Sequence, residues 1–168
     1  MRQDIAKKSK KWLKVLKYND FRVPYQILID NSFINIANKH NIKFSTIKDL
    51  FKSEPKLLMT KCVYELNKSH TLPNDFSGQC EITQCTHDKP DKNCTASFIK
   101  AGNPHHYIYA TNNIFIIKSL KTSTDTPILR IFQNQLVIEC NKMDQSPKTH
   151  NGNPASKKEL KTLRKMFE

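Results

Sequence analysis

The sequence predicts an α/β fold organised around a mostly parallel β-sheet. Short apolar runs that end in turn residues alternate along the chain with segments whose apolar residues recur at helical spacing. The 168 residues suit one domain, and the 38% of apolar residues suffices for a real core. Because successive strands joined through helices pair in parallel, we expect an α/β sandwich.

The first half of the expected core contains two strands, each followed by helix. The apolar run after Pro24 ends at an acid and predicts a buried parallel strand. The elements expected here are a strand over 25–30, helices over 32–40 and 45–51, a strand over 56–60 and a helix over 61–68.

The second half repeats this alternation beyond a cluster of cysteines and histidines. The expected elements are a short helix over 96–100, a strand over 106–111, a helix over 112–120, and strands over 127–132 and 136–138. We therefore divide the chain into a basic N-terminal arm over 1–22, a domain over 23–140 with a loop at 80–94, and a basic tail over 141–168.

Both arms are predicted to be basic and amphipathic. In residues 2–17, the apolar side chains of Ile5, Trp12, Leu13 and Leu16 interleave with seven basic ones. This helix can meet phosphate, dock on its own domain through Trp12, or lie on a membrane surface. In the tail, residues 156–159 form a capping box that opens a helix, which suits either RNA or a partner protein.

The formal charge of +13 predicts a polyanionic partner, because Lys and Arg gain affinity by neutralising phosphates. The competing interpretation is a compositional bias, since lysine far outnumbers arginine. Lysine is a point-charge donor, so we expect these contacts to hold phosphate rather than read bases. The expected RNA-contacting residues are Lys7, Lys8, Lys10, Lys11 and Lys14 in the first helix, and Lys157, Lys158, Lys161, Arg164 and Lys165 in the last.

Several function classes have no support in the sequence. No glycine-rich phosphate-binding motif is present, which disfavours nucleotide-hydrolysing and dinucleotide enzymes. No run approaches the roughly 18 apolar residues of a membrane span. The basic N-terminal residues are not followed by an apolar region, so we expect an intracellular, reducing environment and no membrane partner.

Four residues within 80–94 have the character of zinc ligands. Cys80, Cys85, His87 and Cys94 form the pattern C-x4-C-x-H-x6-C, and thiolates with an imidazole suit a closed, structural Zn²⁺ site. The alternative is three incidental cysteines in a polar loop. Cys62 and Cys140 lie in apolar contexts and are expected to be inert core residues, while His105 and His106 are expected to pack at a strand entry.

Acidic and amide side chains are expected to meet at the carboxyl ends of the strands. Asp30 ends the first strand, Glu65 lies on the helix after the second, and Asn113 follows the third. Metal-dependent phosphodiester cleavage needs several carboxylates to hold its ion. With an amide in place of one acid, we expect Mg²⁺ or Mn²⁺ to bind weakly.

Motifs of a known family occur at residues 1–3, 23–30, 60–66, 80–87, 102–111 and 127–134. In these motifs the chain resembles the ribosomal-RNA-processing PIN-domain proteins of the UTP twenty-three type, relatives of the Fcf PIN proteins. The resemblance covers about residues 1–140 and is most specific in the Asn-Pro-His-His-Tyr segment.

This resemblance implies a PIN-like three-layer α/β/α sandwich with an inserted CCHC zinc loop. It also implies a nucleolar component of the small-subunit processome, associated with a box H/ACA snoRNA and with early cleavage of pre-rRNA. The PIN nuclease acids fall on Asp30, on Glu65 and on Asn113, where the third acid is missing. We therefore expect a noncatalytic RNA-binding assembly factor.

Two other functions are alternatives to an RNA-binding assembly factor. A metal-dependent endoribonuclease would need another acid, for which Asp125 is a weak candidate because of its loop position. A DNA-binding zinc protein would need a base-reading helix after the zinc segment, and the sequence does not predict one.

Overall fold

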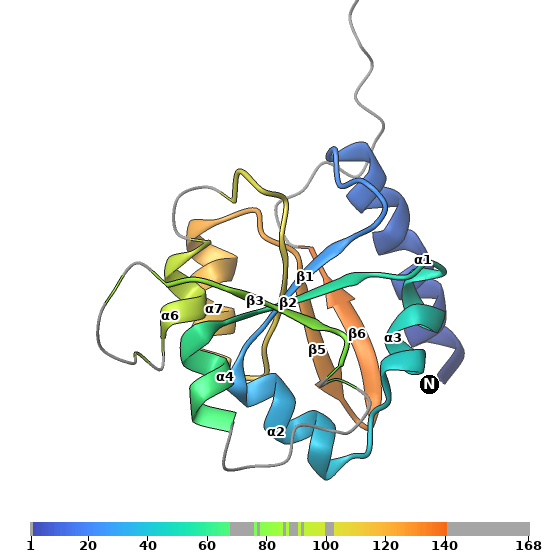
Figure 1. Ribbon diagram of the computed structural model, residues 1–168. Helices are drawn as coiled ribbons and strands as arrows, with labels where there is room; N and C mark the ends of the chain where they lie inside the picture. Colours follow the sequence, from blue (N-terminus) through green and yellow to red (C-terminus); the bar gives the residue numbers. More distant parts are fainter. Residues whose placement is uncertain are drawn as a thin grey trace, which may run out of the picture.

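A six-stranded sheet forms the centre of the protein (Figure 1). The computed structural model describes residues 2–67, 76, 78–85, 87, 91, 93–99 and 103–140. The strand order is β3-β2-β1-β4-β5-β6, and neighbours pair in parallel except for the antiparallel pair β5–β6. The strands are β1 (Gln26–Ile29), β2 (Lys56–Thr60), β3 (Cys80–Thr83), β4 (Ile108–Ala110), β5 (Ile128–Phe132) and β6 (Gln135–Glu139).

Helices cover both faces of the sheet, which confirms the predicted α/β/α sandwich. The described helices are α1 (Arg2–Tyr18), α2 (Asn31–Lys39), α3 (Phe44–Phe51), α4 (Lys61–Asn67), α6 (Cys94–Ser97) and α7 (Ile114–Ser123). Ile27 and Ile29 pack in the larger core with α1, α2 and α3. Leu28 between them points to the opposite face, where Ile117 and Leu120 of α7 pack.

The central strands are buried on both faces, as parallel strands between helical layers must be. In β1, the side chains of Ile27, Leu28 and Ile29 are at most 2% exposed. Burying each such side chain stabilises the fold by roughly 1.5–3 kcal/mol. This burial explains why the apolar runs in the sequence locate β1 and β2 well.

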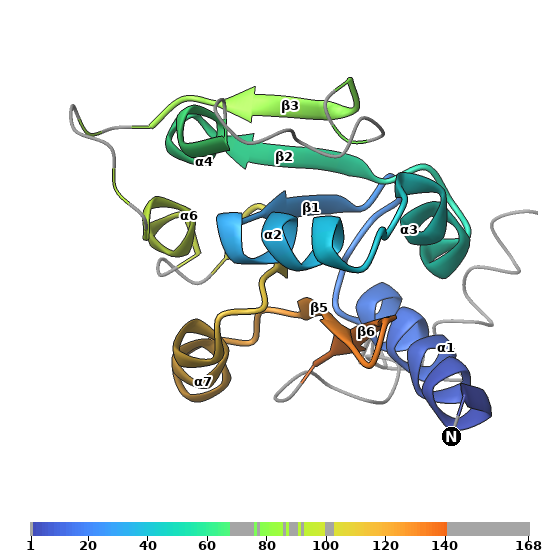
Figure 2. The ribbon, with the colours of Figure 1, turned by 90° about the horizontal axis from the view of Figure 1, so that it is seen from below.

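Helix α1 docks on the sheet edge through its apolar face. It lies beside β6 (Figure 2), and Val15 and Leu16 are almost fully buried there. Trp12 and Leu13 pack partly against the same core. None of the helices in the described part of the chain is long and apolar enough to cross a bilayer.

Strand β3 was missed by the sequence analysis, which placed residues 80–94 in a loop. Cys80–Thr83 instead pair in parallel with β2 at the sheet edge. An edge strand buries little, and Glu81 and Ile82 are both exposed. Its four residues therefore lack the apolar run that identified the inner strands.

Candidate functional site

The candidate cleft lies at the carboxyl ends of β1 and β4, the two central strands. The chain order of the sheet reverses between these neighbours, because β2 and β3 lie beyond β1 while β5 and β6 lie beyond β4. Parallel sheets bind their ligands at such switch points. Asp30 follows β1 here, and Thr111, Asn112 and Asn113 follow β4.

Both carboxylate oxygens of Asp30 already accept hydrogen bonds from the protein. Oδ1 accepts from the Ser32 hydroxyl at 2.7 Å and from the Phe33 backbone N–H at 2.9 Å. Oδ2 accepts from the Thr111 hydroxyl at 2.5 Å and from the Tyr109 hydroxyl at 3.4 Å. The bond to Phe33 makes Asp30 the N-cap of α2.

Burial raises the pKa of Asp30 above its usual value, because only 4% of the residue is exposed. The hydrogen bonds from Thr111, Ser32 and Phe33 act in the opposite direction and offset part of this rise. The ionised carboxylate is therefore tolerated at a net cost to the folded state.

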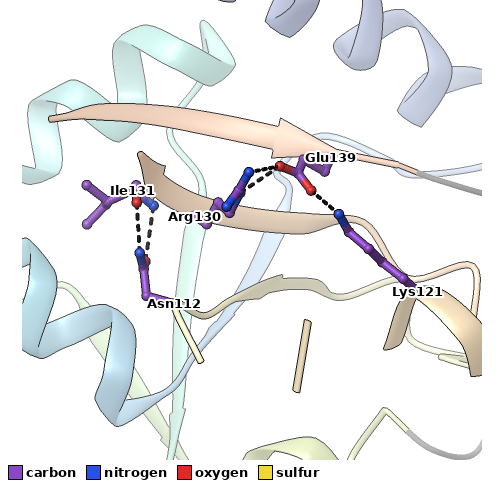
Figure 3. A network of polar contacts seen from close by, with 5 residues as sticks. All are labelled: Asn112, Lys121, Arg130, Ile131 and Glu139. Carbon is purple, nitrogen blue, oxygen red and sulfur yellow. Dashed lines mark hydrogen bonds and ion pairs between the residues drawn. The ribbon is translucent and has the colours of Figure 1, made fainter. Parts of the chain in front are cut away.

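Asn113 uses its side chain to start α7. Its Oδ1 accepts from the backbone N–H groups of Phe115 at 3.0 Å and Ile116 at 3.5 Å. Asn112 beside it extends the pairing of β4 with β5 (Figure 3). Its amide donates to the Ile131 carbonyl at 2.7 Å and accepts from the Ile131 N–H at 3.1 Å.

The remaining acids proposed for this cleft do not complete a metal-binding group. Glu65 is exposed on α4, and Asp125 is exposed after α7. Within the described ranges, no set of three or more His, Cys, Asp or Glu ligand atoms gathers around Asp30. The structure thus places one buried carboxylate and two engaged amides at this edge.

A second site brings together Cys62, Cys85, His87 and Cys94, whose ligand atoms all lie within 4.8 Å of one another. The Cys85 sulfur lies 3.7 Å from that of Cys62 and 3.3 Å from that of Cys94. His87 Nε2 lies 3.5 Å from Cys62 Sγ and 3.0 Å from Cys94 Sγ. Ligands at about 2.3 Å around a tetrahedral Zn²⁺ are about 3.8 Å apart, so the arrangement fits such an ion.

This cluster joins residues from three parts of the fold. Cys62 lies in the first turn of α4, Cys94 begins α6, and Cys85 and His87 follow β3. The Asp91 N–H donates to Cys62 Sγ at 3.5 Å, as backbone groups beside metal-bound thiolates commonly do. Burial raises the pKa of the Cys94 thiol to about 12, so a metal ion must displace its proton.

The predicted ligand Cys80 is not part of this cluster, and Cys62 stands in its place. Cys80 begins β3 and pairs with Leu57, whereas the cluster forms beyond the other end of that strand. Three residues of strand span roughly 10 Å, which removes Cys80 from the ligands. Cys62, which was predicted to be inert, was missed because Val63 and its neighbours give it the appearance of a core residue.

The predicted RNA-binding lysines of α1 are all exposed. They are Lys7, Lys8, Lys10, Lys11 and Lys14. Of these, Lys8 and Lys11 lie on the side of α1 that is next to the β5–β6 hairpin. The second predicted set, Lys157, Lys158, Lys161, Arg164 and Lys165, lies outside the described residues. His105 and His106 precede β4 and do not join the cysteine cluster among the residues described.

Comparison with known proteins agrees with this architecture. The model of the Fcf1 family matches residues 49–140, more than half of the chain. A solved structure described as that of the PIN domain endonuclease Utp24 superimposes with a TM-score of 0.62 at 22% sequence identity. The match covers 74% of this chain and 98% of that one, and at this identity it establishes a PIN-like fold.

Substituting Cys62 and Cys80 separately tests which of the two binds the metal. We expect Cys62→Ser to abolish stoichiometric zinc in the purified protein and to lower its melting temperature by roughly 5–10 °C, because structural zinc contributes folding free energy. Cys80→Ser is the matched control and should retain the metal. Measurement is by elemental analysis and thermal unfolding with and without a chelator. Zinc lost from Cys80→Ser and kept in Cys62→Ser would contradict the structure.

The buried Asp30 carboxylate predicts a pH-dependent stability difference. The pKa of Asp30 is higher in the folded protein than in the unfolded chain, where it is about 4. Its contribution to stability is therefore fully present below about pH 4 and is lost as pH rises through the folded-state pKa. Asp30→Asn keeps an N-cap and does not ionise. The melting temperature of the variant relative to the parent should therefore increase from pH 4 to pH 7. A difference that shrinks over this range would show that the ionised form is the favoured one.

Proposed function

The chain belongs to the Fcf1 family, and we propose that it is a noncatalytic, RNA-binding PIN-domain assembly factor for early pre-rRNA processing. Within that family, we assign the protein to the UTP twenty-three type, which acts in the small-subunit processome of the nucleolus. Its proposed partners are pre-rRNA, a box H/ACA snoRNA and other processome proteins. The motifs around Asn103, Tyr107 and Arg130 support this assignment.

The engagement of the Asp30 and Asn113 side-chain oxygens in fold-stabilising hydrogen bonds is the observation that carries this proposal. Asp30 accepts four hydrogen bonds, two at each oxygen, and the Asn113 oxygen caps α7. Hydrolysis by a divalent ion needs several charged oxygens that can turn toward the metal. An amide at position 113 supplies no charge, so the cleft is poorly suited to hold Mg²⁺ or Mn²⁺.

The competing function is a metal-dependent endoribonuclease that cleaves pre-rRNA. It is favoured by Asp30, an acid kept in a buried position where ionisation is costly. Buried acids with shifted pKa values are common at catalytic sites. The two functions differ in whether Asp30 acts through a metal ion or through the hydrogen bonds to Ser32 and Thr111.

Zinc is proposed as a structural ion held by Cys62, Cys85, His87 and Cys94. Four protein ligands leave no open position for a substrate or a water, which is typical of structural sites. The ion would hold the segment after β3 and the start of α6 against α4. In this way it would support one side of the RNA-binding domain without taking part in chemistry.

The proposed RNA interface begins on the exposed face of α1. Its exposed lysines are part of the net charge of +13 and concentrate positive charge along one helix. The apolar face of α1 is docked through Val15 and Leu16, so the helix presents these lysines from a fixed position. Fixed cations lose less conformational entropy on binding phosphate than a free arm would.

Single-turnover cleavage of a pre-rRNA fragment in Mn²⁺ tests the noncatalytic assignment. We expect no specific cleavage by the parent and no change with Asp30→Asn. Asn113→Asp restores the third acid with a residue that also caps helices, so it should fold and bind Mn²⁺ more tightly than the parent. Calorimetric titration of Mn²⁺ measures this gain. Specific cleavage by the parent that Asp30→Asn abolishes would establish the endoribonuclease instead.

Neutralising lysines of α1 tests the RNA interface. Changing Lys7, Lys10 and Lys14 to Gln should make the slope of log affinity against log salt shallower by about 2, because each lost phosphate contact removes roughly 0.7–0.9. The measurement is fluorescence anisotropy of a labelled pre-rRNA fragment over a range of KCl concentrations. The control changes three exposed lysines elsewhere, Lys39, Lys43 and Lys118. Equal slopes for both triple variants would remove α1 from the interface.

A further inference from the structure

A pocket lies between α1 and the β5–β6 hairpin, on the side of the protein away from the cysteine cluster. Its volume is about 410 Å³, within the roughly 300–1,000 Å³ of small-ligand pockets. Lys8, Lys11 and Trp12 line it from α1, and Arg130, Phe132 and Val137 line it from the hairpin. Cationic and aromatic side chains thus meet around one hollow.

Phe132 is the apolar wall of this pocket, and it is unusually exposed. It ends β5 with 45% of its surface accessible, while Ile131 beside it is buried on the other face of the sheet. The following turn, Gln133–Asn134, has φ values of 49° and 59°, as a tight two-residue hairpin requires. This turn fixes Phe132 at a rigid strand end rather than on a loop.

The guanidinium of Arg130 is held in place over that ring. It lies 5.1 Å from the Phe132 ring centroid, and its Nε donates to Glu139 at 2.6 Å. Glu139 also pairs with Lys121 at 2.6 Å, so one acid is shared by two cations (Figure 3). The negative charge that faces the pocket is therefore neutralised, and Lys8 and Lys11 leave its rim positive.

We infer that this pocket binds one unstacked nucleobase of single-stranded RNA, with Phe132 and Trp12 contacting the base and Lys8 and Lys11 contacting its flanking phosphates. Bases stack on aromatic rings and on guanidinium planes, and both kinds of surface are present here. A duplex keeps its bases stacked and would offer this pocket only phosphate. The inference rests on the proposed RNA-binding function and specifies single-stranded rather than double-stranded segments.

Charge complementarity favours RNA over an apolar peptide as the occupant. Three cations and one neutralised acid line a pocket whose apolar walls include the rings of Trp12 and Phe132. The ammonium of Lys11 lies 5.6 Å from the Trp12 ring, so a phosphate and a base could be met by adjacent residues. The test below includes the outcome in which a peptide occupies the pocket and RNA does not displace it.

Trp12 is the single tryptophan of the chain, which makes its fluorescence a reporter of this pocket. The full-length protein is titrated with a short oligouridylate while Trp12 emission and the anisotropy of the labelled RNA are both recorded. We expect both signals to change with the same affinity. An abasic RNA of equal length and an RNA duplex should bind more weakly or leave Trp12 emission unchanged.

Substitutions at Phe132 separate stacking from folding. Phe132→Ala and Phe132→Leu should weaken oligouridylate binding by about fivefold or more, whereas Phe132→Tyr should retain the parent affinity. The matched control is Phe115→Ala, because Phe115 is 79% exposed on α7 and lies outside the pocket. Lys8→Gln with Lys11→Gln should weaken the oligouridylate and the abasic RNA alike.

The outcomes separate this inference from the function on which it rests. RNA binding by anisotropy with unchanged Trp12 emission and no effect of Phe132→Ala would overturn the pocket and leave RNA binding in place. Absence of any RNA binding by the parent protein would overturn both. Equal quenching by the abasic RNA, or a peptide that occupies the pocket and is not displaced by oligouridylate, would also overturn it.

Discussion

The hydrogen-bonded carboxylate of Asp30 is the contact through which the central strands and the cleft are coupled. Its four donors come from α2, from β4 and from the residue that follows β4. A buried acid without such donors would be strongly destabilising. The hydroxyl groups that donate hydrogen bonds to Asp30 therefore engage the same carboxylate oxygens that a divalent ion would need. Under the proposed function, these contacts stabilise the fold and weaken metal binding at the same position.

Most of the fold could be predicted from the sequence, because its inner elements bury continuous or periodic apolar faces. The strand expected over 56–60 coincides with β2, and helix α1 differs from its expected range by one residue. Strand β3 could not be predicted in this way, since an edge strand with exposed Glu81 and Ile82 has no apolar period. The start of α7 was placed early because the capping role of Asn113 depends on its backbone conformation, which spacing does not reveal.

The candidate metal site shows where linear spacing stops being informative. Cys85, His87 and Cys94 lie close in sequence, and spacing identified them. The fourth ligand is decided by which strand end faces the segment after β3, and the parallel pairing of β2 with β3 brings Cys62 there. Its helical, apolar surroundings resemble those of a core cysteine. A ligand supplied across a sheet from a distant segment can be assigned once topology is known.

We propose that Asn113, at the position of the third nuclease acid, lets this PIN-like fold hold RNA without cleaving it. Asn and Asp cap helices about equally well, so this exchange costs the start of α7 little. It removes one negative charge from a cleft that a polyanion would approach, in a protein of charge +13. Under the proposed function, this amide would lower the affinity for a catalytic ion and reduce the repulsion of phosphate. The docked helix α1 and the pocket at Phe132 offer cations and an aromatic surface elsewhere on the same fold. The proposed binding role thus depends on a residue that caps α7 about as well as the acid would.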